Sequence, residues 1–407
     1  MDNEVESHEA RGIFARKSCV VAGHICLDII PPLISVADFG SAFKPGRLLE
    51  TGPVLMSTGG AVSNTGLALH KLGINTQLMG KVGSDIFGQA VLNLVKDIDE
   101  KLAGGMNIVA GEASSYTVIL NPPNTDRIFL HCPGANDTFG VEDINYDLLR
   151  QVDLFHFGYP PLMKRMYQND GAELVEMFKR AKATGVTTSL DTSMPDPTAP
   201  AGQANWPLIF KGSLPYVDLF VPSLHEILFM LYPDIFKEVT AQNRSITPAL
   251  ASRIADDLLA MGVKILMLKA GHLGLYLRTA DETRLADLGR ACPADLARWA
   301  RREVWSPIFK VNVVGTTGSG DATIAGFLAA FLRDLLPTET ATMASAVGAC
   351  NVEAADAVSG IRSWKETTAR VKAGWPRQLL NFTDPSWQFD PARQLWLGPN
   401  DALAHQV

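Results

Sequence analysis

Several signatures that would assign a chemistry directly are missing from this 407-residue sequence. It has no Gly-x-x-x-x-Gly-Lys-Ser/Thr loop, which excludes a Walker-type triphosphatase, and no Gly-x-Gly-x-x-Gly after the first expected strand, which excludes a dinucleotide enzyme. The five cysteines are scattered without Cys-x-x-Cys pairs, and the eight histidines include no His-Glu-x-x-His pair. Reduced thiols are therefore expected instead of a disulfide frame or a zinc site, in a protein poor in metal.

Long apolar runs and clusters of positive charge are missing as well. Stretches such as residues 324–332 are too short to cross a bilayer, and residues 1–11 are acidic and polar, without the apolar centre of a secretion signal. The net charge is −7 and no Lys/Arg run is extended, so neither nucleic acid nor membrane is an expected partner. We therefore expect the protein to be cytoplasmic. At this length it forms one large α/β domain or two smaller ones.

What is present is an alternation of apolar strands and amphipathic helices. Helical patterns, notably over Ala172–Ala183 and 248–261, lie between the apolar runs. The strand-like runs are 18–23, 152–157, 186–190, 217–221 and 263–268. This order predicts a parallel sheet covered on both faces, with ligands gathering at one edge formed by strand ends.

Two segments interrupt this rhythm. Residues 31–58 are rich in Pro, Gly and Ser, and within 107–132 two β-rich runs flank the breaker cluster at 122–124, which is typical of a hairpin. We interpret the two segments as a small β-lid whose strands leave the main sheet.

The remaining segments lie before, within and after the main domain. Residues 1–17 are interpreted as a disordered or flexible leader, 18–374 as the main domain, and 375–407 as an irregular C-terminal extension on the surface. Residues 279–305 are charged and are interpreted as an insertion.

The stretch from Val313 to Asp321 is the most informative one. An apolar run enters a loop with three glycines in six residues, and an amphipathic helix follows. Crowded backbone N–H groups and the positive end of the helix dipole make an anion site. Asp321, at the end of the loop, either caps the helix or accepts a proton from an attacking hydroxyl.

A second glycine block, over residues 57–73, opens another helix. Asn64, one turn into it, can donate and accept hydrogen bonds, which suits hydroxyl recognition, although taken alone the block is better explained by a small-residue helix packed closely on a sheet. Asp28 follows a strand end, where it is either a ligand contact or a solvated turn acid.

The two glycine blocks, in this order, resemble the signatures of ribokinase-like (PfkB-type) carbohydrate kinases. That family carries an N-terminal Gly-Gly motif and a C-terminal Asp-Thr-x-Gly-Ala-Gly-Asp motif, and here the second reads Gly-Thr-Thr-Gly-Ser-Gly-Asp over residues 315–321. The resemblance extends over residues 18–370. It implies a ribokinase-like three-layer α/β/α sandwich with a mostly parallel central sheet, and a lid that closes over the sugar and sometimes forms a dimer interface.

The resemblance also implies roles for individual residues in an ATP-dependent sugar kinase. Asp321 is the expected base, and the N–H groups of Gly318, Ser319 and Gly320 form the anion hole for the γ-phosphate. The expected sugar contacts are Asp28, Gly59, Gly60 and Asn64. The expected contacts to the nucleotide are Ser223, Glu226, Lys269, Gly271, Gly274 and Thr316, with Glu226 helping to place the Mg²⁺ that ATP carries.

Departures from the family pattern and rival functions complete the prediction. Gly315 stands where the family usually has an Asp linked to monovalent cations, so K⁺ activation is questionable, and Ser223 replaces the usual Asn. Tyr159, Arg127 and His131 are candidate specificity residues. The alternatives are a nucleoside kinase on the same fold and a catalytically idle sugar-binding protein.

Overall fold

The computed structural model describes residues 17–33, 42–122, 127–242, 245–378 and 380–404. Most of the expected leader, part of the 31–58 segment and part of the turn at 122–124 lie outside these ranges. The last three residues of the C-terminal extension do so too.

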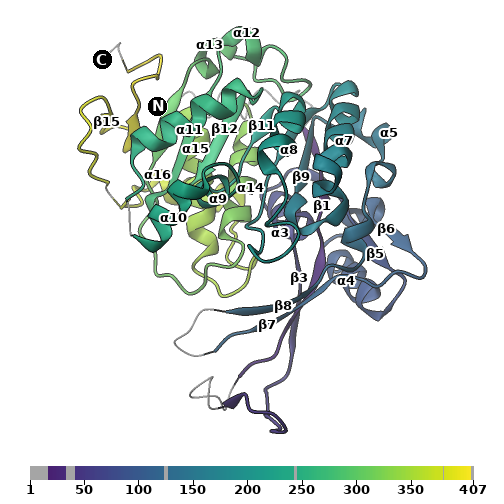
Figure 1. Cartoon of the computed structure of the whole chain (residues 1–407). Helices are drawn as coiled ribbons and strands as arrows, with labels where there is room; N and C mark the ends of the chain where they lie inside the picture. Colours follow the sequence, from purple (N-terminus) through teal and green to yellow (C-terminus); the bar gives the residue numbers. More distant parts are fainter. Residues whose placement is uncertain (1–16, 34–41, 123–126, 243–244, 379, 405–407) are drawn as a thin grey trace.

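A ten-stranded sheet runs through the centre of the molecule (Figure 1). Parallel pairs join its first six strands, as predicted from the alternating runs. These strands are, in spatial order, β4 (Asn75–Met79), β1 (Ser18–Gly23), β9 (Leu154–Gly158), β10 (Thr187–Leu190), β11 (Leu219–Phe220) and β12 (Ile265–Lys269). Antiparallel strands continue the sheet: β13 (Leu275–Thr279), β14 (Glu303–Ser306), β16 (Leu395–Leu397) and β15 (Gln388–Asp390).

Helices cover both faces of the sheet, because its strands are apolar on both sides. In β1, Cys19 and Val21 belong to one buried cluster, whereas Val20 and Ala22 belong to another. The first cluster includes side chains of α3 (Ala61–Lys71), α4 (Ile86–Lys96), α14 (Ser319–Phe331) and α15 (Pro337–Asn351). The second includes side chains of α7 (Ala172–Ala183), α8 (Trp206–Ser213), α9 (Leu224–Leu231) and α11 (Pro248–Ala260). The three-layer α/β/α fold is therefore confirmed.

The remaining helices each place at least one side chain in or against these clusters. The longer ones are α10 (Pro233–Ala241), whose Phe236 packs on the second cluster, and α16 (Trp364–Lys372). The short ones are α5 (Tyr146–Leu149), α6 (Lys164–Tyr167), α12 (Glu282–Leu285) and α13 (Leu296–Trp299).

A separate four-stranded sheet projects from the body at one end (Figure 1). Its strands are, in spatial order, β3 (Leu55–Gly59), β2 (Cys26–Ile30), β7 (Tyr116–Leu120) and β8 (Ile128–Cys132). The expected hairpin is the antiparallel pair β7–β8, and β2 bridges it to β3. We call this sheet the lid. A small parallel pair, β5 (Lys81–Gly83) with β6 (Asn107–Val109), forms a third sheet. Along the chain it lies between β4 of the central sheet and β7 of the lid.

The C-terminal segment differs from the expected irregular surface extension. Its strands β16 and β15 extend the central sheet, and Trp387 and Leu395 are buried in the cores. The buried Asp401 carboxylate accepts a hydrogen bond of 2.9 Å from Arg302 Nε, which ties the segment to the start of β14. Strands of three residues with turns between them carry too little periodicity to be recognised from sequence.

The 279–305 segment also has a defined place. It holds α12 and α13 and connects the antiparallel neighbours β13 and β14. Asp28 lies inside lid strand β2, not beyond a strand of the main sheet as expected.

Candidate active site

The chemistry-bearing residues gather where the parallel strands end. Register places Gly23, at the end of β1, beside Gly158 at the end of β9, and Leu190 of β10 beside Phe157. The residues that follow or end these strands are His24, Tyr159, Asp191 and Lys269. Carboxyl ends of parallel strands form the ligand edge of an open α/β sheet, so these four share the predicted edge.

The glycine loop before α14 has the backbone expected of an anion site. Gly318 adopts a left-handed conformation (φ 68°) as the N-cap, and a side chain there would press on Ala357. Across the described residues, the N–H groups of Gly318 and Gly320 have no hydrogen-bond partner. The Ser319 N–H instead donates to the Thr316 carbonyl at 3.3 Å, inside the loop. Two of the three expected N–H donors are thus available to an anion.

Asp321 does not cap its helix. The helix begins at Ser319, and the Asp321 side chain, 6% exposed, turns toward neighbouring elements. Asn64 Nδ2 donates to Oδ2 at 3.0 Å, Thr65 Oγ1 donates to Oδ1 at 3.3 Å, and the Tyr159 hydroxyl also donates to Oδ1. Burial raises the pKa of Asp321, while these hydrogen bonds and Lys269 oppose the rise. The raised pKa is consistent with a general base, and the helix shows no side-chain cap hydrogen bond among the described residues.

A buried ion pair lies beside the loop. Lys269 Nζ donates to Asp191 Oδ1 at 2.7 Å and to the Val221 carbonyl at 2.8 Å. Burial lowers the pKa of Lys269, but the attraction of Asp191, Glu226 and Asp321 together outweighs it, so the pKa is raised overall and the ammonium persists. A Cβ added to Gly320 would lie 3.6 Å from Lys269 Cε. The lysine stem therefore runs directly beside the anion loop.

Glu226 and Ser223 form a capping box at the start of α9. Ser223 Oγ accepts from the Glu226 N–H at 3.3 Å, and Glu226 Oε2 accepts from the Ser223 N–H at 2.9 Å and from the Thr192 hydroxyl at 2.7 Å. Ser caps helices as well as Asn does, so the departure at Ser223 preserves the local structure. The second carboxylate oxygen of Glu226 has no hydrogen-bond partner in the described chain.

The turn after β12 requires its glycines. Gly271 and Gly274 have positive φ angles of 58° and 94°, and the Ala270 N–H closes the turn on the Gly274 carbonyl at 2.8 Å. The turn immediately follows Lys269, so it lies at the same strand edge.

The lid supplies the other half of the site. Asp28 on β2 faces Gly59 on β3 so closely that any Cβ at Gly59 would collide with its carboxylate. Burial raises the pKa of Asp28 to about 6, against the hydrogen bonds of Cys26 and Thr117. Gly60, with φ 89°, begins α3 where a side chain would collide with His24.

Three rings form a row from the lid to Asp321. His131 on β8 lies 5.3 Å from His24, which lies 6.1 Å from Tyr159, measured between ring centroids. His24 is 2% exposed, and neither of its ring nitrogens has a partner in the described chain. Burial, with a smaller effect of His131, lowers the pKa of His24 to about 3, so the ring is neutral. Arg127, also on the lid, donates to Thr317 Oγ1 in the anion loop.

The structure thus brings the predicted residues to one edge and adds others. Tyr159, Arg127 and His131, proposed only as specificity candidates, all reach it. Asp191, Thr65 and His24 were missed. Asp191 directly follows the apolar run 186–190, so the rule that singled out Asp28 would also have found it.

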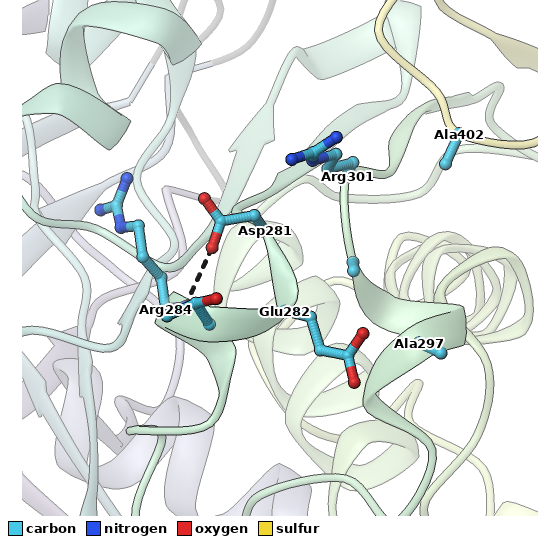
Figure 2. Close-up of a pocket in the computed structure, with 8 residues that line it drawn as sticks. Asp281, Glu282, Arg284, Ala297, Arg301 and Ala402 are labelled. Atoms are coloured by element: carbon cyan, nitrogen blue, oxygen red, sulfur yellow. Dashed lines mark hydrogen bonds between the residues drawn. The ribbon is translucent and has the colours of Figure 1, made fainter.

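A surface pocket of about 600 Å³ lies elsewhere and shares no residue with this edge. Figure 2 shows that α12, α13 and the C-terminal segment line it, with Asp281 accepting from the Arg284 N–H at 3.0 Å. The Arg284 guanidinium donates hydrogen bonds to the Leu259 and Val263 carbonyls. Nothing in this lining points to chemistry. Within the described ranges, no helix is long and apolar enough to span a bilayer, and no cluster of three metal-ligating side chains occurs.

Fold and site together define a ribokinase-like kinase. Residues 16–364 match the model of the pfkB family of carbohydrate kinases, and the chain belongs to this family. It is 27% identical to an uncharacterized sugar kinase of Archaeoglobus fulgidus over 72% of this chain and 98% of that one. It is 24% identical to fructokinase-2 of Oryza sativa subsp. japonica over 77% and 79%.

Solved structures confirm the fold. Ribokinase of Arabidopsis thaliana, complexed with ribose and ATP, superposes with a TM-score of 0.65 at 18% identity, covering 88% of this chain and 99% of that one. Fructokinase of Xylella fastidiosa with bound ATP gives 0.65 at 20% identity with the same coverage. A nucleoside kinase of Methanocaldococcus jannaschii gives 0.62 at 19% identity, covering 88% and 100%.

Proposed function

We propose that this sugar kinase transfers the γ-phosphoryl group of ATP to a sugar hydroxyl, with Asp321 as the base. The observation that carries the proposal is the position of Asp321. Its buried carboxylate lies in the first turn of α14, next to the N–H groups of Gly318 and Gly320, which have no partner among the described residues. A carboxylate at an anion site repels its ligand, and accepting a proton from the attacking hydroxyl explains its presence there.

The residues present fit Mg-ATP. The N–H groups of Gly318 and Gly320 and the Lys269 ammonium would hold the terminal phosphate, and Gly271, Gly274 and Thr316 would border the nucleotide. Glu226, with one carboxylate oxygen that has no partner among the described residues, would contact the metal through water. Bound Mg²⁺ neutralises phosphate charge as the phosphoryl group moves.

K⁺ is not part of the proposal. A Cβ at Gly315 would already lie 2.9 Å from the Ala354 carbonyl oxygen and 3.0 Å from that of Ala355. The aspartate that the family usually has at this position would not fit the present loop without a shift.

The lid half of the site would bind the sugar. Asp28 accepts hydrogen bonds, Asn64 Oδ1 is buried without a partner in the described chain, and Gly59 and Gly60 leave room beside them. Residues 31–58 and 107–132 would close over the substrate and exclude water as a competing acceptor.

A second copy of this chain would pair with the lid. Leu55 and Met56 on β3 and Phe129 and Leu130 on β8 are more than half exposed, and such apolar side chains favour burial against a partner. Sedimentation of the wild type and of Leu130→Glu tests this: a dimer that becomes a monomer is expected, and a monomeric wild type contradicts it.

ADP release measured over a panel of sugars and nucleosides tests the function. A sugar should stimulate release, and Asp321→Asn should reduce kcat by roughly 10²- to 10⁴-fold, the usual contribution of a general base. That variant should retain the rise in melting temperature that the sugar causes. Near-normal turnover of Asp321→Asn contradicts the mechanism. Stimulation by nucleosides alone would establish the nucleoside kinase instead, and binding without turnover the idle sugar-binding protein.

A further inference from the structure

The Oδ1 atom of Asp321 already accepts two hydrogen bonds in this structure. A carboxylate oxygen has two lone-pair directions, and Oδ1 accepts from both Thr65 Oγ1 and the Tyr159 hydroxyl. Oδ2 accepts from Asn64 Nδ2. An acceptor hydroxyl that gives its proton to Oδ1 must therefore first replace one of the donors already there.

Tyr159 is the donor with freedom to leave. Thr65 is completely buried on α3, a helix whose side chains form one core with those of α14. Tyr159 lies in the segment after β9, is half-buried, and ends the row of rings that starts on the lid at His131. His24 lies between Tyr159 and His131 of the lid, whereas Thr65 is held in the core.

We propose that Tyr159 is a positioning residue that occupies the place of the acceptor hydroxyl on Asp321 until a sugar displaces it. The inference rests on the proposed function and adds a specificity device to the same base. With Tyr159 in place, water cannot take the position in line with the phosphate.

Once a sugar has displaced Tyr159 from Asp321, the ordinary phosphoryl transfer follows. The acceptor O–H bond breaks and its proton goes to Asp321 Oδ1, while the acceptor oxygen forms a bond to the γ-phosphorus. The bond from phosphorus to the bridging oxygen breaks, and its electron pair leaves with ADP. When water is the acceptor, the same steps give inorganic phosphate.

Tyr159→Phe tests the inference because it removes the hydroxyl and keeps the ring. We expect ADP release with Mg-ATP and no sugar to rise about tenfold, since water can then contact Oδ1. The matched control is Tyr146→Phe. The hydroxyl of Tyr146 has no partner in the described chain and lies outside the site. The double variant Tyr159→Phe/Asp321→Asn should lose the extra hydrolysis.

The pH profile gives an independent measurement. The Tyr159 hydrogen bond lowers the pKa of Asp321, so Tyr159→Phe should move the acidic limb of kcat/KM to higher pH. Lys269 also faces Asp321, with Asp191 and Glu226 near the lysine, and all three are unchanged in this variant. In the wild type, the best sugar of the panel should change the ultraviolet spectrum of a tyrosine, and the change should be absent in the variant.

Several outcomes would overturn the proposal. Sugar-free hydrolysis and an acidic limb that both equal those of the wild type would reduce Tyr159 to a packing residue. If Tyr159→Phe does not fold, a wild-type tyrosine spectrum unchanged by saturating sugar leads to the same conclusion. Persistent activity of Asp321→Asn would instead refute the base itself, so the two failures are distinguishable.

Discussion

The two halves of the site differ in how completely their buried side chains are paired. On the phosphate side, Lys269 and Asp191 bind each other, and Glu226 and Ser223 cap α9. On the sugar side, both ring nitrogens of His24 and Oδ1 of Asn64 are buried without partners among the described residues. Buried polar atoms are normally hydrogen-bonded, so unpaired ones mark where a ligand belongs.

This difference suggests that one half stabilises the transition state and the other binds the sugar. The charged side chains of the proposed phosphate side are held by their partners before any ligand arrives, and such preorganised charge is effective at stabilising a transition state. The sugar side, built partly on the lid, gains its missing hydrogen bonds only when a substrate enters. Variants on the first side should therefore lower kcat, and variants on the second should raise KM for the sugar.

The largest effect in this comparison is expected for Lys269→Met. Loss of one preorganised donor at a developing charge commonly costs a factor of about 10²–10³ in kcat. Steady-state kinetics with varied ATP measure it, and KM for the sugar should change little. Asp191→Asn is the matched variant: it keeps Lys269 and its bond to Val221, so its kcat should fall less. If Lys269→Met changed only the KM of the sugar, the lysine would belong to the other half.

The sequence indicates the proposed phosphate side more directly than the proposed sugar side, for a physical reason. Gly318 and Asp321 belong to one contiguous motif whose chemistry follows from a loop and a helix start. The sugar side is assembled from β1, β2, β3 and β8, and the proximity of His24, His131 and Tyr159 depends on how the lid meets the body. Short spacing in sequence reveals the first arrangement, whereas only tertiary structure reveals the second.

The same distinction applies to the fold. Most of the parallel strands were recognisable because they are apolar on both faces, as in β1. Strands β15 and β16 were missed because each spans only three residues, and their place depends on distant partners such as Trp305, opposite Trp396. Long-range pairing of short segments leaves little trace in local periodicity.

Gly59→Ala should break the sugar side while sparing the phosphate side. The added methyl would collide with the Asp28 carboxylate and push it from its place. We expect KM for the sugar to rise roughly tenfold, the equivalent of one lost hydrogen bond of about 1–1.5 kcal/mol. ADP release without sugar should be unaffected. Gly104→Ala is the control, because a Cβ there meets nothing within 4 Å. Equal KM values for the two variants would remove Asp28 from the sugar site.

The smallest effect expected is a pH dependence of sugar affinity. Asp28 titrates with a pKa of about 6, raised by burial, and only its ionised form accepts hydrogen bonds from the sugar through both oxygens. Affinity should therefore be full above this pKa and fall as the pH drops through it, with KM rising about fourfold between pH 7 and pH 5.5. The effect of the Asp28 titration on folding stability has the opposite pH dependence. Because burial favours the protonated form, Asp28 lowers stability as the pH rises from its unfolded pKa to about 6.

Asp28→Asn separates this carboxyl from the others in the site. The variant cannot ionise at position 28, so its KM for the sugar should be higher at pH 7 and flat across the same range. Its kcat should still fall at low pH with the protonation of Asp321, because that base lies in the other half. A sugar KM that remained pH-dependent in Asp28→Asn would assign the titration to another group. The division between a preorganised phosphate side and a ligand-completed sugar side would then have to be redrawn around that group.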